Sequence, residues 1–130
     1  MKFSLLVLGH PQSSPAARSA LRFAEATVAG GHELFRVFFF HDAVATGSAL
    51  TVTPQDQLDL PRAWQALGRQ HNIDLVLCIS SALRRGIVDQ REAARYELGN
   101  GNCLEGFELS GLGQWVEAML LSDRLVTFGA

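Results

Sequence analysis

The stretch LVLCISSALRRG, residues 75–86, decides the fold class of this chain. It opens with a short apolar run, which is typical of a strand buried inside a parallel sheet. It then turns abruptly to small residues and arginines, so we expect the strand to leave the core at this point as a cationic loop. We predict the strand over residues 73–79. Cys78 then lies at the carboxyl end of a strand, where α/β proteins usually carry their chemistry.

Cys78 has two interpretations that the residues alone leave open. The thiolate is the reactive form of cysteine, and a nearby arginine charge or a following helix amino terminus favours it. Arg84 and Arg85 are candidates for that charge, and they are equally candidates for a subunit-interface pair. In the alternative interpretation, Cys78 is a small hydrophobic residue packed in the core.

The rest of the chain alternates apolar strands with amphipathic helices. We predict strands over residues 2–8, 34–40, 73–79, 107–109 and 125–128. We predict helices that begin at Ser13 or Ser14, near Asp59 and at Ser110, and a further helix over residues 90–98. This alternation predicts βαβ units. The expected fold is a single-domain α/β three-layer sandwich over residues 1–130, flavodoxin-like, with a mainly parallel sheet and helices on both faces.

A long polar segment, residues 41–57, follows the second predicted strand. We interpret it as a loop that folds over the carboxyl edge of the sheet or meets a partner. His41 comes first in this segment, and it shares the sheet edge with Cys78 if the two strands are adjacent and parallel. His41-Asp42 could supply a cation or a proton acceptor near the thiol. An ordinary polar turn is the alternative.

Composition excludes several classes of protein. With 48% hydrophobic and 18% charged residues, the 130-residue chain is not disordered and is expected to bury surface against other subunits. Its formal net charge of −2 and lack of a basic face argue against direct nucleic-acid binding. Cys78 and Cys103 form neither a disulfide framework nor a zinc-ligand spacing, which fits a reducing cytoplasm. Residues 3–8 fit a first strand better than a signal peptide, and no run is long enough to span a membrane.

No motif for an organic cofactor is complete. Ser110-Gly111-Leu112-Gly113 lacks the third glycine of a dinucleotide fingerprint, and no phosphate loop of the Walker type occurs. The Ser13-Ser14 turn could hold a flavin phosphate at a helix amino terminus. Helix capping explains these serines equally well, and we prefer it. We therefore expect neither a cofactor nor a bound metal.

Several further runs of residues are similar to those of a known family. After Cys78 come Ala82-Leu83-Arg84-Arg85-Gly86-Ile87-Val88-Asp89 and then Glu92-Ala93. The other matching runs, in order, are residues 31–34, 37–39, 62–64, 107–114, 117–118 and 123–126. Together they cover nearly the whole chain, and this chain resembles the TusD/DsrE family of sulfur-relay proteins, TusD most of all. Two departures are Ala43, where similar proteins often have glycine, and the turn Gly9-His10-Pro11.

The resemblance implies a DsrE-like fold and a sulfurtransferase that carries sulfur as a persulfide on Cys78, without a cofactor. It implies TusB-like and TusC-like partner subunits in a heterohexamer, a TusA-like donor and a TusE-like acceptor, towards 2-thiolation of the tRNA wobble uridine. The alternatives are a DsrE-like subunit in dissimilatory sulfur oxidation and a non-catalytic scaffold subunit.

Persulfide transfer requires one exposed thiol of low pKa. It also requires protection from oxidants. We expect that protection from the segment 41–57 and a neighbouring subunit.

Overall fold

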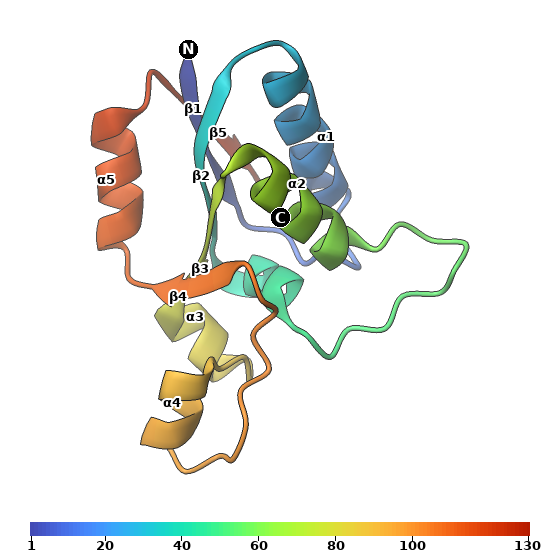
Figure 1. The fold of residues 1–130 in the computed structure, drawn as a ribbon, viewed down its shortest axis with the longest axis vertical. Helices are drawn as coiled ribbons and strands as arrows, with labels where there is room; N and C mark the ends of the chain where they lie inside the picture. Colours follow the sequence, from blue (N-terminus) through green and yellow to red (C-terminus); the bar gives the residue numbers. More distant parts are fainter.

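The computed structural model describes residues 1–130 and contains one five-stranded sheet in which every pair of neighbouring strands is parallel. The strands are β1 (Lys2–Val7), β2 (Glu33–Phe39), β3 (Asp74–Cys78), β4 (Phe107–Ser110) and β5 (Arg124–Phe128). Their order across the sheet is β4-β3-β2-β1-β5 (Figure 1). The α/β class and the parallel sheet predicted from the sequence are confirmed.

The helices are α1 (Pro15–Ala29), the 3-10 helix η1 (His41–Gly47), α2 (Leu60–His71), α3 (Ile79–Arg84), α4 (Gln90–Arg95) and α5 (Gly113–Leu121). Helices α1 and α2 cover one face of the sheet and α5 covers the other, while α3 and α4 lie beyond the end of β3 (Figure 1). None of the helices has the length and apolar character needed to cross a lipid bilayer. The predicted three-layer arrangement is confirmed.

The strand order explains why the helices divide in this way. From β1 to β4 the chain adds strands in one direction, so right-handed crossovers place α1 and α2 on the same face. The last strand returns to the other side of β1, and the reversed direction places α5 on the opposite face.

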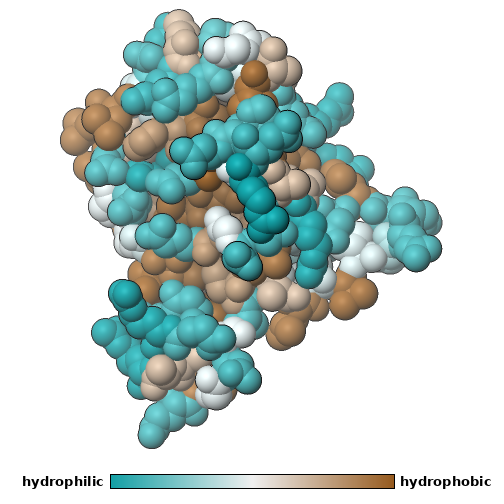
Figure 2. All heavy atoms as spheres, in the orientation of Figure 1, coloured by the Kyte–Doolittle hydropathy of each residue, from teal (hydrophilic) through white to brown (hydrophobic).

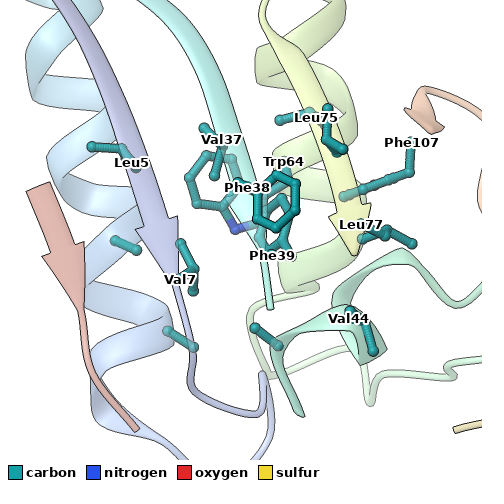
Figure 3. Close-up of a cluster of buried hydrophobic side chains, with 14 of the residues drawn as sticks. Leu5, Val7, Val37, Phe38, Phe39, Val44, Trp64, Leu75, Leu77 and Phe107 are labelled. Carbon is teal, nitrogen blue, oxygen red and sulfur yellow. The ribbon is translucent and has the colours of Figure 1, made fainter. Parts of the chain in front are cut away.

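The core is built from the alternating side chains of β2, a central strand. Phe39 points to the α2 face, where its ring packs edge-on against Trp64 with centroids 5.5 Å apart (Figure 3). Phe38 points to the other face, with its ring centroid 6.2 Å from that of Trp115 in α5. Both phenylalanines are fully buried. An apolar run without polar alternation is what a strand covered on both faces requires.

Arg36, on the α5 side of β2, ties that helix to the sheet. Its guanidinium donates to Asp74 at 2.7 Å and to Glu117 at 2.9 Å, and also to the carbonyl of Gln114 at 2.8 Å. Burial alone would lower the pKa of Arg36, but hydrogen bonds and attraction to the two carboxylates outweigh burial and raise it. The side chain therefore stays charged although only 5% of the residue is exposed.

The predicted helix starts have mixed outcomes. Asp59 caps α2 by accepting the Arg62 amide, and Asp89 caps α4 by accepting the Glu92 amide. Ser110 was expected to begin a helix, which is wrong, because it ends β4 and α5 begins only after Leu112. The backbone pairs Ser110 with Cys78 in the sheet, and that pairing overrides its capping tendency.

Ser14, one of the two residues predicted to begin the first helix, lies immediately before α1, but its hydroxyl makes no capping hydrogen bond. The hydroxyl is buried without a hydrogen-bond partner, close to Gly9, where an added Cβ would lie 2.3 Å from it. Close packing of this turn, rather than side-chain capping, is what Ser14 contributes.

Candidate functional site

Cys78 stands at the junction of a strand and a helix. It is the last residue of β3 and the residue immediately before α3, which begins at Ile79 without an intervening loop. The sequence predicted a loop here, and that prediction is wrong. Small side chains at Ser80, Ser81 and Ala82 let the chain turn directly from strand to helix against the end of the sheet.

The helix brings two serine hydroxyls to the thiol. Ser80 Oγ lies 3.4 Å from Cys78 Sγ. Burial raises the pKa of the Cys78 thiol, but hydrogen bonds from the side chains and backbone amides of Ser80 and Ser81 outweigh it, and the net pKa is lower than usual. These donors stabilise the thiolate more than the thiol. Sequence analysis did not single out either serine, although hydroxyls two and three residues after a cysteine at a helix start were a usable signal.

The Cys78 residue is only 1% exposed in the isolated chain and belongs to the hydrophobic core cluster. This differs from the exposed thiol that persulfide transfer was expected to require. The site thus contains a buried thiol of lowered pKa, and a reaction partner can reach this thiol only when the structure opens locally.

His41 lies beside this site, as predicted from the parallel pairing. Strands β2 and β3 are neighbours in register, with Phe39 opposite Leu77, so both strands end at the same edge of the sheet. The backbone amide of His41 donates to Ser81 Oγ at 3.2 Å. Its imidazole packs on Phe40, with ring centroids 4.1 Å apart. The contact with the thiol's surroundings is therefore made by the main chain of His41.

The first part of the segment 41–57 is more ordered than predicted. Residues His41–Gly47 form η1, in which Ala43 and Val44 are fully buried, whereas residues 48–57 form the expected loop. Gly47 packs so closely on β3 that an added Cβ would lie 2.3 Å from Leu77 Cδ1. Because η1 is short and has only two apolar side chains in its buried part, hydrophobic periodicity did not reveal it.

The two candidate arginines are placed differently. Arg85 donates from Nε to Asp42 at 2.9 Å and from Nη1 to the carbonyl of Ser81 at 3.2 Å. Arg84 is exposed and makes no hydrogen bond or ion pair. It lines an apolar hollow of about 300 Å³ together with Leu83, Val88, Tyr96 and Leu98. The side chain of Arg85 thus links α3 to η1, and the side chain of Arg84 makes no such link.

Cys103 has a different environment from Cys78. Its Sγ is directed to the carbonyl oxygens of Leu104 and Phe107, at 3.7 and 3.5 Å. Burial, assisted by the negative charge of Asp89, raises the pKa of the Cys103 thiol to about 11. At neutral pH this thiol stays protonated and is not in the reactive thiolate form.

The Ser13-Ser14 turn does not have the lining of a flavin pocket. No three His, Cys, Asp or Glu side chains come together as a metal-ligand group. The turn at Ser13 and Ser14 opens on a hollow of about 460 Å³ that has no hydrophobic lining residue. An isoalloxazine ring would find no apolar wall there, although cofactor pockets are mostly apolar.

Comparison with known proteins places this chain in a family. The model of the DsrE/DsrF-like family matches residues 1–128. The chain belongs to the DsrE/DsrF-like family. Among its relatives, the sulfurtransferase TusD homolog of Pseudomonas aeruginosa is 51% identical over 129 residues, which are 99% of this chain and 98% of the relative. The sulfurtransferase TusD homolog of Vibrio vulnificus is 46% identical, covering 98% of both chains. The predicted resemblance to TusD is confirmed.

A solved structure supports the same fold. The ychN protein from E. coli superimposes with a TM-score of 0.78 at 19% identity, covering 98% of this chain and 99% of that one. The DsrE-like three-layer architecture is therefore shared well beyond the TusD homologs. Membership of the family and similarity to named sulfurtransferases support a sulfurtransferase role for this chain.

Proposed function

We propose that this chain is a sulfurtransferase subunit that accepts sulfur as a persulfide on Cys78 and passes it to a partner thiol, towards 2-thiolation of the tRNA wobble uridine. The observation that carries the proposal is the lowered pKa of Cys78 at a strand-to-helix junction. The 51% identity of this chain to a sulfurtransferase TusD homolog supports the same proposal.

The proposed loading step is a thiol exchange with one additional sulfur. The Cys78 thiolate attacks the outer sulfur of a donor persulfide, and a new S–S bond forms on Cys78. The S–S bond of the donor breaks, and the donor cysteine leaves as a thiolate with the electron pair of that bond. One sulfur atom has moved, and no external oxidant or reductant is consumed.

The proposed unloading step has the same form. A thiolate of the acceptor protein attacks the outer sulfur of the Cys78 persulfide, and Cys78 leaves as a thiolate. A thiol of lower pKa is a better leaving group, so the hydrogen bonds from Ser80 and Ser81 assist this step as well as the first.

A second candidate function is a scaffold subunit in which Cys78 only fills space. The 1% exposure of Cys78 favours this candidate, because buried cysteines usually act as small hydrophobic residues. The lowered pKa favours the sulfurtransferase, because burial in an apolar core by itself raises a thiol pKa.

The experiment that separates the two candidates measures sulfur transfer directly. The chain, in its native complex, is incubated with a persulfide-loaded donor, and the added mass of one sulfur atom is followed by mass spectrometry. We expect that mass on the wild type and on Cys103→Ser, its removal by a reductant, and its absence from Cys78→Ser. A Cys78→Ser complex that still relays sulfur at the normal rate would assign the chemistry to a partner subunit.

The pathway is part of the proposal and has its own test. For tRNA thiolation, loss of this chain should abolish 2-thiouridine at the wobble position, and Cys78→Ser should fail to restore it. Unchanged 2-thiouridine together with a lost capacity for sulfur oxidation would favour the DsrE-like alternative. We place the chemistry in a reducing cytoplasm, where the free thiols Cys78 and Cys103 persist.

We also propose that TusB-like and TusC-like subunits complete a heterohexamer, with a TusA-like donor and a TusE-like acceptor. Hydrophobic side chains reach the surface over α5 (Figure 2). The exposed ones from the start of α5 to β5 are Leu112, Val116, Met119, Leu120, Leu121 and Leu125. Apolar patches of this kind mark protein contacts. Co-expression with the neighbouring related subunits should yield one complex, and a stable monomer in their presence would contradict the assembly.

A further inference from the structure

Two separate contacts join η1 to the helix that follows the reactive cysteine. The first is the ion pair between Asp42 and Arg85, with Arg85 Nε 2.9 Å from Asp42 Oδ1. The second is the hydrogen bond from the His41 amide to Ser81 Oγ, at 3.2 Å. Both contacts link the same two segments, and the residues of each segment are neighbours in sequence.

Arg85 connects the two contacts. While Nε holds Asp42, Nη1 donates to the carbonyl of Ser81 at 3.2 Å. One guanidinium therefore holds both the beginning of η1 and the backbone of Ser81, whose hydroxyl accepts the His41 amide. A planar side chain with several donors can do this, and an ammonium group cannot hold both partners in the same geometry.

The hydroxyl of Ser81 is buried and has a defined role in this arrangement. A hydroxyl offers one proton and accepts through its lone pairs. Because Ser81 Oγ accepts the His41 amide, its proton remains free to be donated elsewhere. Only 6% of Ser81 is exposed, so water has little access to that proton, and a hydrogen bond from the Ser81 side chain is among the contacts that lower the pKa of Cys78.

We propose that Asp42 and Arg85 are positioning residues of the sulfur-transfer site: their ion pair holds η1 on α3, so that the His41 amide orients the Ser81 hydroxyl towards Cys78. The inference rests on the function proposed above, and it assigns Arg85 a role through Ser81 rather than a direct charge interaction with the thiolate.

The backbone conformation of His41 indicates that contacts to α3 hold η1 in place. Its φ of 53° lies in the left-handed region, which is uncommon for a residue other than glycine. Such a conformation persists only where surrounding contacts hold it. The two contacts to α3, together with the buried side chains Ala43 and Val44, supply that support.

The charged environment allows the two roles of Arg85 to be told apart. Charged and titratable side chains near the carboxyl ends of the strands are His10 after β1, His41 and Asp42 in η1, Arg84 at the end of α3, Arg85 directly after it, and Glu108 in β4. If Arg85 acted on the thiolate by charge alone, removing the negative Asp42 would favour the thiolate and removing Arg85 would disfavour it. If the ion pair acts by positioning, both removals disfavour the thiolate.

The test compares Asp42→Asn with Arg85→Gln in the full chain. The pH profile of Cys78 alkylation by iodoacetamide is measured with peptide mass mapping, which separates Cys78 from Cys103. We expect both variants to move the midpoint of the profile to higher pH and to slow labelling at pH 7 by about threefold to tenfold. The double variant should resemble either single variant, because all three break the same contact.

Arg84→Gln is the matched control, since it removes one positive charge from the adjacent position, which has no ion pair. Its midpoint should stay at the wild-type value. Arg85→Lys keeps the charge but loses the fork, so it should move the midpoint in the same direction as Arg85→Gln. Because the side chains of Asp42 and Arg84 are exposed, we expect their replacement to leave the fold intact, and thermal unfolding checks this.

The inference is overturned if Asp42→Asn lowers the midpoint while Arg85→Gln raises it, or if neither variant moves it. The readout needs no sulfur donor, so it is independent of whether Cys78 relays sulfur. A complex of Cys78→Ser that still transfers sulfur would instead remove the proposed function and leave the alkylation result standing.

Discussion

Ser80 Oγ lies 3.4 Å from Cys78 Sγ, because α3 begins directly after the cysteine and its first turn brings the hydroxyl back over the thiol. Ser80 is exposed while Cys78 is buried. The serine thus connects a closed thiol with the surface, and its hydrogen bond is one of the contacts that lower the pKa of Cys78.

Alkylation at neutral pH should select Cys78 over Cys103. The pKa of Cys78 is lowered, whereas that of Cys103 is raised to about 11. At pH 7 a larger fraction of Cys78 is therefore in the thiolate form, which reacts once local opening admits the reagent to this buried thiol. Peptide mass mapping after brief treatment with iodoacetamide measures the selectivity, and preferential labelling of Cys103 would contradict it. Selectivity should decline as pH rises towards the pKa of Cys103.

Ser80→Ala should raise the pKa of Cys78. The variant removes the hydroxyl that lies 3.4 Å from the thiol. Burial raises the pKa of Cys78, and fewer hydrogen bonds then remain to lower it. We expect the alkylation profile to move to higher pH and labelling at pH 7 to slow about threefold to tenfold, with folding unchanged because Ser80 is exposed. Ser13→Ala, at an exposed serine outside this site, is the control. An unchanged profile would show that Ser80 does not stabilise the thiolate.

Sequence reasoning located the main strands and placed Cys78 at the end of one of them, because these features depend on long or distinctive signals. The apolar run of β2 can only be a buried strand, and Cys78 marks the end of another. It missed α3, which is only six residues long and follows β3 without a turn signal. It also missed the roles of Ser80 and Ser81, because a hydroxyl's contact with the thiol depends on that short helix being present.

The partners of Arg85 were equally beyond sequence analysis. Arg85 and Asp42 are 43 residues apart, and nothing in a single sequence states that an arginine after one strand reaches an aspartate after another. The parallel register did predict that His41 and Cys78 share an edge of the sheet, and this is confirmed. Which side-chain atoms meet at that edge follows from η1, whose buried turn lacked a recognisable pattern.

Arg36→Ala should destabilise the fold without altering the thiol. The change removes the guanidinium that joins Asp74 in β3 to Glu117 in α5. Both carboxylates are about half exposed, at 47% and 53%, and can regain water, so we expect a loss of about 2 kcal/mol rather than the larger cost of stranding a buried charge. Urea unfolding measures the loss. Arg18→Ala, at an exposed arginine of α1, should change the free energy of unfolding little. An equal effect of both variants would show that the ion pairs of Arg36 do not hold α5.

Leu120→Glu should separate assembly from folding. Leu120 is 79% exposed on α5, so a charged side chain there meets water in the isolated chain and should leave its thermal unfolding nearly unchanged. In the proposed heterohexamer the same carboxylate would be buried against a related subunit without a partner, which costs several kcal/mol. We expect co-purification with TusB-like and TusC-like subunits to fail or to weaken at least tenfold. Leu50→Glu, at a 72% exposed leucine in the loop after η1, is the matched control and should still assemble. A complex that forms normally with Leu120→Glu would move the subunit contact away from this face of α5.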